Sequence, residues 1–402
     1  MSKAVGLTLL GVDVRSLAQS AAVRDLPRQG RRWSRRPLTG IDCFGDLDAR
    51  AACDRFVRAE ACNADALADA AIAAARGGAH DRADLIIGGG LDARPDLLRR
   101  LERHYRRRGN GPEVAGLLAE PARWFGLLDR LGIAHPPVAF CRPSVPDGWL
   151  LKHAASCGGQ AVLPASDAGP DLAADAYFQR FVAGPVASVV FIADGRDARI
   201  IGFNRLFFVT VGRRTFSYAG AVSWAGPSVE EQRTVLGWVD RLTREFGLRG
   251  LNGIDLVLPA SGAPVSERGP LLLELNARPT ATLELHPERL PGGAVQCHLA
   301  ACDGRPPSMP IDATAPRGFH GYRVLYAPHP VRVTRRDWPA WCRDRPVPGS
   351  HIAAGEPICC VYADGDDGVL VEKRLRRRAT VVLRSLAAST QSQPDAPDTE
   401  AA

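Results

Sequence analysis

The sequence predicts a mixed fold of helices and strands, α/β in its first part and α+β beyond, divided into two or three domains. Three observations support this prediction. Strand and helix patterns alternate from residue 5 to residue 87, which is typical of a parallel sheet covered by helices. Two apolar strands marked by acidic residues follow between residues 253 and 276, and short strands with turn residues occupy the segment after Pro316. A chain of 402 residues is also long for a single hydrophobic core.

The composition is that of an ordinary globular protein, with 46% hydrophobic and 24% charged residues. No apolar run reaches the ~18–20 residues of a membrane span, so we expect neither a membrane protein nor a membrane partner. The N-terminal apolar stretch includes Asp13 and therefore predicts a first strand instead of a secretion signal. Ten cysteines without a C-x-x-C pair indicate reduced thiols, no zinc site and a cytoplasmic location.

The net charge of +7 has its main sources in arginine clusters at residues 28–36 and 99–108, with a smaller cluster at 374–378. Such clusters can bind the phosphates of nucleic acid. The second cluster, however, follows a helix pattern whose other face would be solvated, and no RNA-binding, zinc-finger or helix-turn-helix motif accompanies it. Solvated surface is therefore the favoured interpretation, and nucleic acid is not expected as a partner.

The alternating N-terminal pattern divides into five elements. Apolar runs bounded by turn residues predict the strands, and apolar residues at helical spacing predict the helices between them. The predicted elements are a strand at 5–14, a helix at 16–24, a strand at 38–43, a helix at 64–76 and a strand at 84–87.

Two groups of residues at strand ends are candidates for ligand contact. Gly88 to Gly90 follow the strand at 84–87, where a backbone without side chains could approach a ligand closely; a tight turn is the alternative. Asp46 and Asp48 follow the second strand and could face the same cleft, or they could cap a helix.

Lysine usage identifies one candidate phosphate ligand. Of 51 basic residues only Lys3, Lys152 and Lys373 are lysines, and the first and last lie near the N-terminus and in a charged run. Lys152 ends a strand-like segment and precedes a loop that contains Gly158 and Gly159. An ammonium group beside a flexible glycine loop suits the phosphates of a nucleotide, whereas the alternative is an exposed lysine ahead of a turn.

Polar residues interrupt two apolar strands on either side of a proline- and glycine-containing loop. Asp255 lies in the first strand, and Glu274 and Asn276 lie two residues apart in the second, so the latter two share a face. The loop residues favour an antiparallel pair. Two carboxylates and an amide oxygen are hard ligands that suit Mg²⁺, and Arg278 beyond them suits phosphate oxygens. The alternative to a metal site is that these three polar residues lie on the solvent-exposed face of a half-buried strand.

The order G-x-x-x-x-D followed by E-x-N-x-R-P resembles the metal-binding hairpin of ATP-grasp enzymes, such as D-alanine–D-alanine ligase and relatives of biotin carboxylase. The resemblance implies that Asp255 holds one Mg²⁺, that Glu274 bridges two, and that Asn276 completes the second site. Mn²⁺ is an alternative ion. Arg278 would steady the transferring phosphoryl group, and Lys152 would hold the phosphates of ATP.

The segment between the lysine and the hairpin resembles the hinge strand of the same family. The resemblance implies that backbone groups of Arg180 and Val182 read the adenine edge, with Gln179 beside it. It also implies that the loop at Gly158 and Gly159 closes over the phosphates.

Apart from Ala277, a minor departure where the family usually has proline, the sequence departs from the family pattern at two positions. Val186 stands where many relatives have a glutamate for the ribose, and Pro121 stands where a second lysine is expected. Arg123 is a candidate substitute for that lysine. These departures affect the expected ribose and α-phosphate contacts and leave the expected fold unchanged.

The resemblance also implies a domain arrangement. A Rossmann-like domain precedes the ATP-grasp domain, and a small β-rich domain follows it. Apolar runs with turn signals predict a strand at 369–372 in that last domain, and the Ser/Pro/Asp-rich composition beyond it predicts a disordered tail. The expected ranges are 1–115 for the Rossmann-like domain, 116–315 for the ATP-grasp domain (subdomains at about 116–178 and 179–315), 316–388 for the β-rich domain and 389–402 for the tail.

The activity implied by the resemblance is that of an ATP-dependent carboxylate–amine ligase, which uses ATP with two Mg²⁺ ions and forms an acyl-phosphate intermediate. A looser resemblance to predicted carboligases related to biotin carboxylase points to the biosynthesis of a C1-carrier coenzyme. The alternatives are a carboxylase-like or purely phosphorylating ATP-grasp enzyme, and a nucleotide-binding regulatory protein without turnover. The implied partners are a small-molecule carboxylate and an amine, and a homodimer is compatible with the resemblance.

Overall fold

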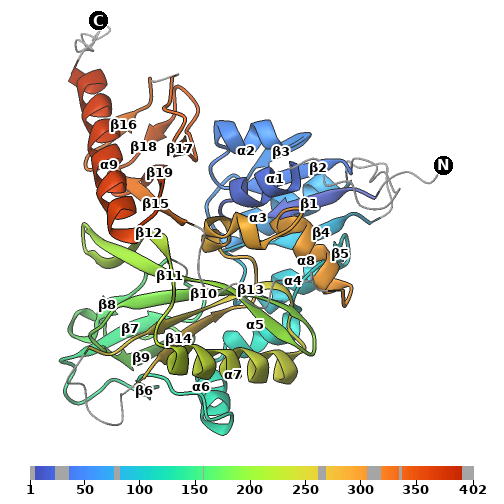
Figure 1. The fold of residues 1–402 in the computed structure, drawn as a ribbon, viewed down its shortest axis with the longest axis vertical. Coiled ribbons are helices and arrows are strands. Elements are labelled where there is room, and N and C mark those ends of the chain that lie inside the picture. The colour runs from blue at the N-terminus through green and yellow to red at the C-terminus, as the bar shows by residue number, and fades with distance from the viewer. Residues whose placement is uncertain are drawn as a thin grey trace, which may run out of the picture.

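The computed structural model describes residues 5–22, 36–76, 82–156, 158–260, 269–305, 318–334 and 337–391. The predictions for residues 28–35, for the domain boundary near 315 and for the tail beyond 391 lie outside this part of the chain. The described chain forms an N-terminal α/β unit, a small antiparallel sheet, and a large antiparallel sheet that the C-terminal segment extends (Figure 1). This arrangement confirms the predicted combination of α/β and α+β structure.

The N-terminal unit is a parallel five-stranded sheet with helices packed against it. Its elements are β1 (Leu7–Leu10), α1 (Arg15–Ala22), β2 (Leu38–Asp42), α2 (Leu47–Ala52), β3 (Arg55–Arg58), α3 (Ala64–Arg76), β4 (Asp84–Ile87), α4 (Pro95–Glu102) and β5 (Arg106–Arg107). The predicted helix at 64–76 and the predicted strand at 84–87 are confirmed as α3 and β4. The strand order is β3-β2-β1-β4-β5, so the connections from β1 and from β4 proceed in opposite directions across the sheet. Parallel sheets bind ligands at the carboxyl ends of the strands where the order switches in this way.

A buried carboxylate at the start of β4 explains part of the arginine clusters. The Asp84 side chain has no exposed surface and pairs with Arg36 at 2.5 Å, with Arg106 at 2.5 Å and with Arg108 at 3.3 Å. Burial opposes the ionisation of Asp84, but the guanidinium groups outweigh burial and hold the pKa of this carboxyl below its ordinary value. The expectation of a solvated face is therefore wrong for Arg108, whose side chain is only 11% exposed and also pairs with Asp303.

Residues 112–180 form two helices and a small antiparallel sheet in the order β6-β9-β7-β8. The elements are α5 (Pro112–Leu118), α6 (Pro121–Arg130), β6 (Val138–Ala139), β7 (Trp149–His153), β8 (Leu163–Pro164) and β9 (Ala176–Arg180). On β7, Leu151 is buried in a small core with Phe178. Because neighbouring side chains alternate along a strand, Lys152 is directed to the opposite face of this sheet.

A large antiparallel sheet of eight strands forms the centre of the molecule. Its strands are β10 (Val186–Asp194), β11 (Ala198–Val211), β12 (Arg214–Trp224), β13 (Arg249–Val257), β14 (Leu271–Asn276), β15 (Phe319–Tyr326), β17 (Cys342–Arg343) and β19 (Pro357–Gly365). The order is β14-β13-β10-β11-β12-β15-β19-β17. Since β12 pairs with β15, the strands of the expected C-terminal domain continue the same sheet.

Strand β10 is buried from Ala187 to Ala193 because both of its faces are covered. Val189 and Phe191 pack in a core with the helix α7 (Val229–Phe246). The alternate residues Val190 and Ile192 pack in a second core with the helix α8 (Ala294–Cys302) and with strand β1 of the N-terminal unit. The N-terminal unit is thereby fixed against one face of the large sheet (Figure 1).

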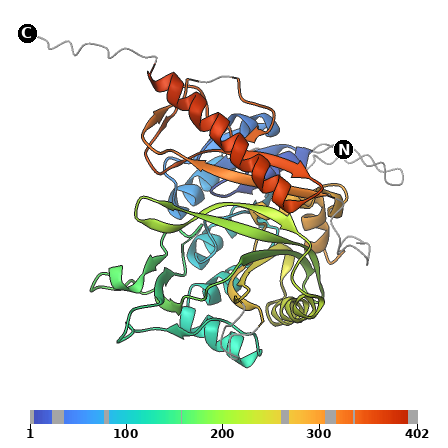
Figure 2. The same ribbon diagram turned by 60° about the vertical axis from the view of Figure 1, so that its left-hand side comes forward.

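The C-terminal segment ends in the helix α9 (Gly368–Gln391), which lies along the outer strands of the large sheet (Figure 2). The predicted strand at 369–372 is therefore wrong. A four-residue window suggests a strand, but Val371, Leu375 and Val382 are buried at helical spacing over a longer window. The helix also includes residues 389–391, which were expected to be disordered. Two further short strands of this segment, β16 (Val331–Arg332) and β18 (His351–Ile352), pair with each other. Among the helices of the described residues, none has the length and apolar character that crossing a membrane requires.

A buried ion cluster joins three distant parts of the chain. Arg15, at the start of α1, is 2% exposed and donates hydrogen bonds to Glu284 at 2.7 and 2.8 Å, to Asp344 at 2.5 Å and to Tyr362 at 2.7 Å. Glu284 belongs to the short 3-10 helix η3 (Ala281–Leu285), Asp344 follows β17, and Tyr362 lies in β19. Burial favours the neutral form of Glu284, but the Arg15 charge outweighs burial and holds the pKa of that carboxyl below its ordinary value.

Candidate active site

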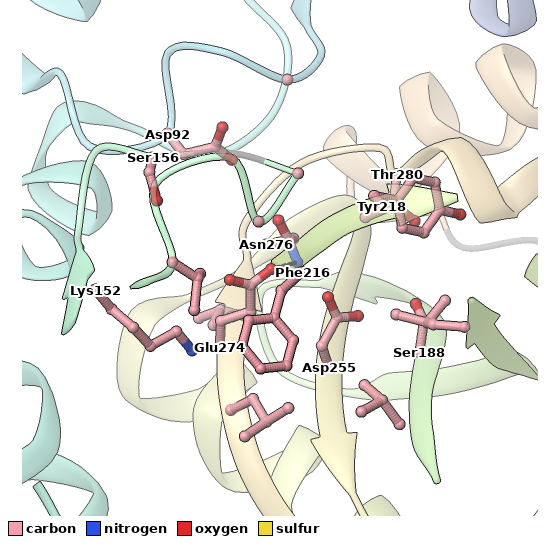
Figure 3. Close-up of a pocket in the computed structure, with 18 of the residues that line it drawn as sticks. Asp92, Lys152, Ser156, Ser188, Phe216, Tyr218, Asp255, Glu274, Asn276 and Thr280 are labelled. Carbon is pink, nitrogen blue, oxygen red and sulfur yellow. Dashed lines mark hydrogen bonds between the residues drawn. The ribbon is translucent and has the colours of Figure 1, made fainter. Parts of the chain in front are cut away.

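A cavity of about 410 Å³ lies between the N-terminal unit, the small sheet and the large sheet (Figure 3). Side chains from all three parts line it, and the residues predicted from the sequence as site residues are all among them. These are Lys152, Gly158, Gly159, Gln179, Arg180, Val182, Asp255, Glu274, Asn276 and Arg278. The structure thus brings the predicted residues together in one place, while the role of each one stays a prediction.

The acidic hairpin is formed by β13 and β14, and the predicted antiparallel pairing of these strands is confirmed. Asp255 lies directly opposite Glu274, and Gly253 lies opposite Asn276. Glu274 is exposed to the cavity, whereas Leu275 beside it is buried in the core on the other side. The Asn276 side chain donates a hydrogen bond from Nδ2 to Glu274 Oε1 at 3.1 Å.

The two carboxyl groups of the hairpin repel each other. Burial raises the pKa of Asp255 well above its ordinary value, and the neighbouring charge of Glu274 raises it further. The Ser188 hydroxyl and the Arg278 guanidinium act in the opposite direction. A cation between the two carboxyl groups would relieve this repulsion, and Mg²⁺ would meet that requirement.

The donor set of the hairpin fits Mg²⁺ in its chemistry. It comprises two carboxylates and the amide oxygen of Asn276, which already accepts a hydrogen bond from Arg278 Nη2 at 2.9 Å and has a second lone pair. Three or more His, Cys, Asp or Glu side chains do not cluster as a metal site anywhere in the described part of the chain. The hairpin could therefore hold a metal ion only with help from the amide, from water or from phosphate oxygens.

Lys152 contributes a positive charge to the cavity. Its ammonium group donates a hydrogen bond to Gln179 Oε1 at 3.0 Å, and no ion pair of Lys152 occurs within the described residues. Figure 3 shows the side chain extending toward the part of the cavity that holds Glu274. A neutral partner leaves the lysine charge uncompensated, so the cavity favours an anion here.

Gln179 has an unused donor beside this lysine. Its side chain is 2% exposed, and its Nε2 atom has no hydrogen-bond partner among the described residues. The oxygen must face Lys152, because an ammonium can only donate, and this fixes the orientation of the amide. A buried donor without a partner is costly, so Gln179 favours a ligand with an acceptor at this position.

The glycine loop after β7 passes close to β12. A Cβ atom at Gly159, where φ is +70°, would lie 2.0 Å from the carbonyl oxygen of Phe216, so only glycine fits this approach. The Tyr218 N–H donates to the carbonyl of Gly158 at 3.1 Å. Asp175 fixes the start of the loop by contacts with His153 Nδ1 at 3.1 Å and with the backbone N–H of Ala155 at 3.2 Å.

The two departures from the family pattern lie at the cavity itself. Val186 and Pro121 both line it. Arg123, the candidate substitute for a second lysine, does not line the cavity; it pairs with Glu120 at 2.7 Å on the surface and is 64% exposed. The structure therefore gives no support to Arg123 as a phosphate ligand.

Several cavity residues were not found from the sequence. Arg278 Nε pairs with Asp92 Oδ1 at 2.5 Å across 186 residues of sequence, and the Arg278 guanidinium lies against Gly89, where an added Cβ would be 3.5 Å away. The absence of a side chain at Gly89, after β4, thus lets the Arg278 guanidinium lie close to the backbone. The position of Asp92 just beyond these glycines, and that of Asp13 just beyond β1, were the available signals.

A chain of hydroxyl groups, also not expected, lies behind Asp255. Ser188 is within 3.4 Å of the Thr282 hydroxyl, which is 3.1 Å from that of Thr280. Figure 3 shows Ser188 beside Asp255. Because Ser188 also contacts the Asp255 carboxyl, these hydroxyls fix the orientation of one predicted metal ligand.

Asp46 and Asp48 do not line the cavity, so the expectation that they face the same cleft is wrong. Asp48 instead accepts hydrogen bonds from the backbone N–H groups of Asp344 at 2.9 Å and Arg345 at 3.1 Å, and so binds the C-terminal segment. Asp46 occupies the N-cap position of α2, but its side chain makes no capping hydrogen bond. The expectation fails for Asp48 because the C-terminal segment contacts its carboxylate.

Replacing Asp46 by asparagine is expected to stabilise the protein at neutral pH. Burial raises the pKa of Asp46 to about 9, and the charges of Asp344 and Asp13 contribute further. A carboxyl whose pKa is raised on folding loses stability as pH rises from the unfolded value, about 4, to the folded value. Asparagine avoids this loss, so the free energy of unfolding should rise by about 1–4 kcal/mol at pH 7. Urea unfolding at pH 5 and pH 8 should show the gain increasing with pH, and an equal gain at both values would contradict this assignment.

The fold and the cavity, with a lysine and a glycine loop facing an acidic hairpin, agree with the resemblance to ATP-grasp enzymes. Residues 127–282 match the family model of the ATP-grasp domain. The chain thus contains an ATP-grasp domain within residues 127–282.

Several solved structures have the same fold over nearly the whole length of this chain. The biotin carboxylase domain of 2-oxoglutarate carboxylase from Hydrogenobacter thermophilus, a dimer in complex with MgADP, ADP and bicarbonate, has a TM-score of 0.67 at 13% identity, covering 94% of this chain and 90% of that one. Biotin carboxylase from Campylobacter jejuni has a TM-score of 0.64 at 15% identity, covering 96% and 91%. N5-carboxyaminoimidazole ribonucleotide synthetase from Thermus thermophilus has a TM-score of 0.62 at 14% identity, covering 97% and 100%. No curated protein sequence matches the chain at a significant level.

Proposed function

We propose that this protein is an ATP-dependent ligase that joins a carboxylate to an amine through an acyl phosphate. The observation that carries the proposal is the cavity in which Lys152, Arg278 and the acidic hairpin face a common space. The ATP-grasp domain supports the use of ATP, and the similar fold of several carboxylases and a synthetase supports an enzyme that activates a carboxylate.

ATP would bind as a substrate between the small sheet and the large sheet. The backbone around Arg180 and Val182, together with the unused Nε2 donor of Gln179, would bind the adenine edge. Lys152 would contact the phosphates, because its charge is uncompensated and because the glycine loop lies beside it. Gly159 permits the loop to approach β12 closely, so the loop can exclude water from the phosphates.

Asp255, Glu274 and Asn276 are proposed to hold two Mg²⁺ ions, with Mn²⁺ as an alternative ion. When bound, the ions would neutralise phosphate charge during phosphoryl transfer. The protein's part is to present the ligands: Ser188 orients Asp255, and Arg278 contacts Asn276. Arg278 itself would stabilise the charge of the transferring phosphoryl group.

The chemistry proceeds in two displacements. A carboxylate oxygen of the first substrate attacks the γ-phosphorus, and ADP leaves with the electron pair of the broken P–O bond. The amine nitrogen then attacks the acyl carbon, phosphate leaves, and the nitrogen loses a proton. Neither step requires a nucleophilic side chain, because the positioning of the substrates and the stabilisation of charge account for both. A step in the biosynthesis of a C1-carrier coenzyme is the narrower form of this proposal, and a homodimer is proposed as the assembly.

A carboxylase-like reaction is the second candidate. One observation favours it: the similar structure from Hydrogenobacter thermophilus holds bicarbonate together with MgADP. In that reaction bicarbonate would take the place of the organic carboxylate as the acceptor of the phosphoryl group.

The two candidates can be separated by measuring ADP release by the purified protein. Pools of amino acids and coenzyme fragments are added with and without bicarbonate, and hydroxylamine is added to trap an acyl phosphate as a hydroxamate. ADP release that requires both a carboxylate and an amine is expected. Release that requires bicarbonate instead would establish the second candidate, and failure of the Mg²⁺ complex of AMP-PNP to bind would exclude both.

A further inference from the structure

One part of the cavity is formed by the N-terminal unit, at the switch in strand order between β1 and β4. Asp13 follows β1, and Gly88 and Gly89 follow β4, so all three lie at the carboxyl ends of neighbouring parallel strands. All three line the same cavity as Lys152 and the acidic hairpin. A switch point of a parallel sheet that opens into a cavity is a general position for ligand binding.

Four acidic side chains line the cavity, and three of them have partners or assigned tasks. They are Asp13, Asp92, Asp255 and Glu274. Asp92 pairs with Arg278 at 2.5 Å, and Asp255 and Glu274 form the acidic hairpin. Asp13 is left with one hydrogen bond in the described structure, from the backbone N–H of Arg15 at 2.8 Å.

The nearby guanidinium of Arg15 has no donor left for Asp13. A guanidinium has five N–H groups. In Arg15, Nε donates to Asp344, the Nη1 atom donates to Gln19 and Glu284, and the Nη2 atom donates to Glu284 and Tyr362. The Arg15 guanidinium therefore stabilises an ionised Asp13 by charge attraction alone. It has no N–H group left to donate a hydrogen bond to the Asp13 carboxylate.

The surroundings of Asp13 increase its need for a positive partner. Burial raises the pKa of Asp13 well above its ordinary value, and the charges of Asp344 and Asp42 add to this effect. Asp42 is itself satisfied by the backbone N–H groups of Phe44 at 2.9 Å and Gly45 at 2.7 Å. A cation entering from the cavity would meet Asp13 first, since Asp42 and Asp344 do not line the cavity.

We propose that Asp13 binds the amino group of the second substrate in its ammonium form, and that this substrate is a primary amine on a short apolar stem. The stem would contact Val12 and Leu17, which line the cavity beside Asp13. This inference rests on the proposed ligase function and names the class of its nucleophile. Before attack, one proton passes from the ammonium nitrogen to the Asp13 carboxylate, which frees the nitrogen lone pair and leaves a neutral carboxylic acid.

The proposal can be tested with two probes of equal shape, n-butylammonium and 1-butanol. Each is titrated against the full chain in the presence of Mg²⁺ and AMP-PNP, and binding is followed by saturation-transfer NMR. The wild-type protein is expected to bind n-butylammonium at least about tenfold more tightly than 1-butanol, because only the ammonium can form an ion pair with the half-buried Asp13 carboxylate. Equal binding of the two probes, or no binding of either, overturns the proposal without any mutation.

Asp13→Asn is the matching variant, because asparagine keeps an oxygen that can accept a hydrogen bond from the backbone N–H of Arg15 while it removes the charge. The variant is expected to lose the preference for the ammonium probe and to keep its affinity for AMP-PNP. Asp46→Asn is the control: it alters a nearby buried acid that does not line the cavity, and it should keep the preference. A variant Asp13→Asn that folds and retains the preference overturns the proposal. If the wild-type protein binds AMP-PNP but shows no preference for n-butylammonium, only the role of Asp13 is refuted. If the wild-type protein does not bind AMP-PNP at all, the proposed ligase function is refuted.

Discussion

Replacing Glu274 by alanine is expected to abolish ATP turnover while leaving the fold intact. Glu274 lies in the middle of the acidic hairpin, opposite Asp255, and its side chain is exposed to the cavity. As the proposed ligand shared by two ions, it would be lost from both sites at once. The rate of ADP formation should fall by at least three orders of magnitude, about 4 kcal/mol in the transition state.

The expected effect on stability is small, because an exposed glutamate on a strand contributes little to folding. Removing it also relieves its repulsion of Asp255, so the melting temperature should be unchanged or slightly higher. Glu245→Ala is a matched control, since Glu245 is exposed on α7 and does not line the cavity. ADP formation by Glu274→Ala at the wild-type rate would refute the metal assignment.

Lys152→Arg is expected to reduce turnover by one to two orders of magnitude or more, about 1.4–3 kcal/mol. The substitution keeps the charge, but a guanidinium is larger, planar and differently directed than an ammonium group. The Lys152 ammonium is held at 3.0 Å from Gln179 in a confined cavity, so the larger group cannot occupy the same position. The change should appear in ADP formation with little change in melting temperature.

The chain offers a close control for this substitution. Lys373 is exposed on α9 and does not line the cavity, so Lys373→Arg should leave turnover unchanged. Arginine is the usual basic residue of this protein, which makes the same replacement at an exposed position harmless. If both variants turn over ATP equally, the phosphate role of Lys152 fails, and much of the argument for the nucleotide site fails with it.

Local patterns in the sequence were sufficient for the elements that carry the hairpin. Glu274 and Asn276 share a face because a strand repeats every two residues, and the pairing of two strands that follow each other along the chain is easily predicted. The helix at 64–76 was similarly defined by its own periodicity. These features depend on residues that are neighbours in sequence.

Features formed by distant segments could not be predicted in this way. The pair between Asp92 and Arg278 spans 186 residues, and the cover over Asp48 comes from residues 344 and 345. The start of α9 was misread because a window of four apolar and acidic residues has no period of its own. In each case the structure depends on contacts with residues far away in the sequence. A local sequence pattern does not show which distant residues will be in contact.

The cluster around Arg15 has a consequence for how the protein is made. Its members enter the growing chain at widely separated times, since Arg15 precedes Glu284 by 269 residues and Tyr362 by 347 residues. Until β19 has been synthesised, the N-terminal unit cannot complete this cluster, and its arginine must stay hydrated. Contacts over such long separations are slow to form, so final docking of the N-terminal unit on the large sheet is expected only after residue 365 has left the ribosome.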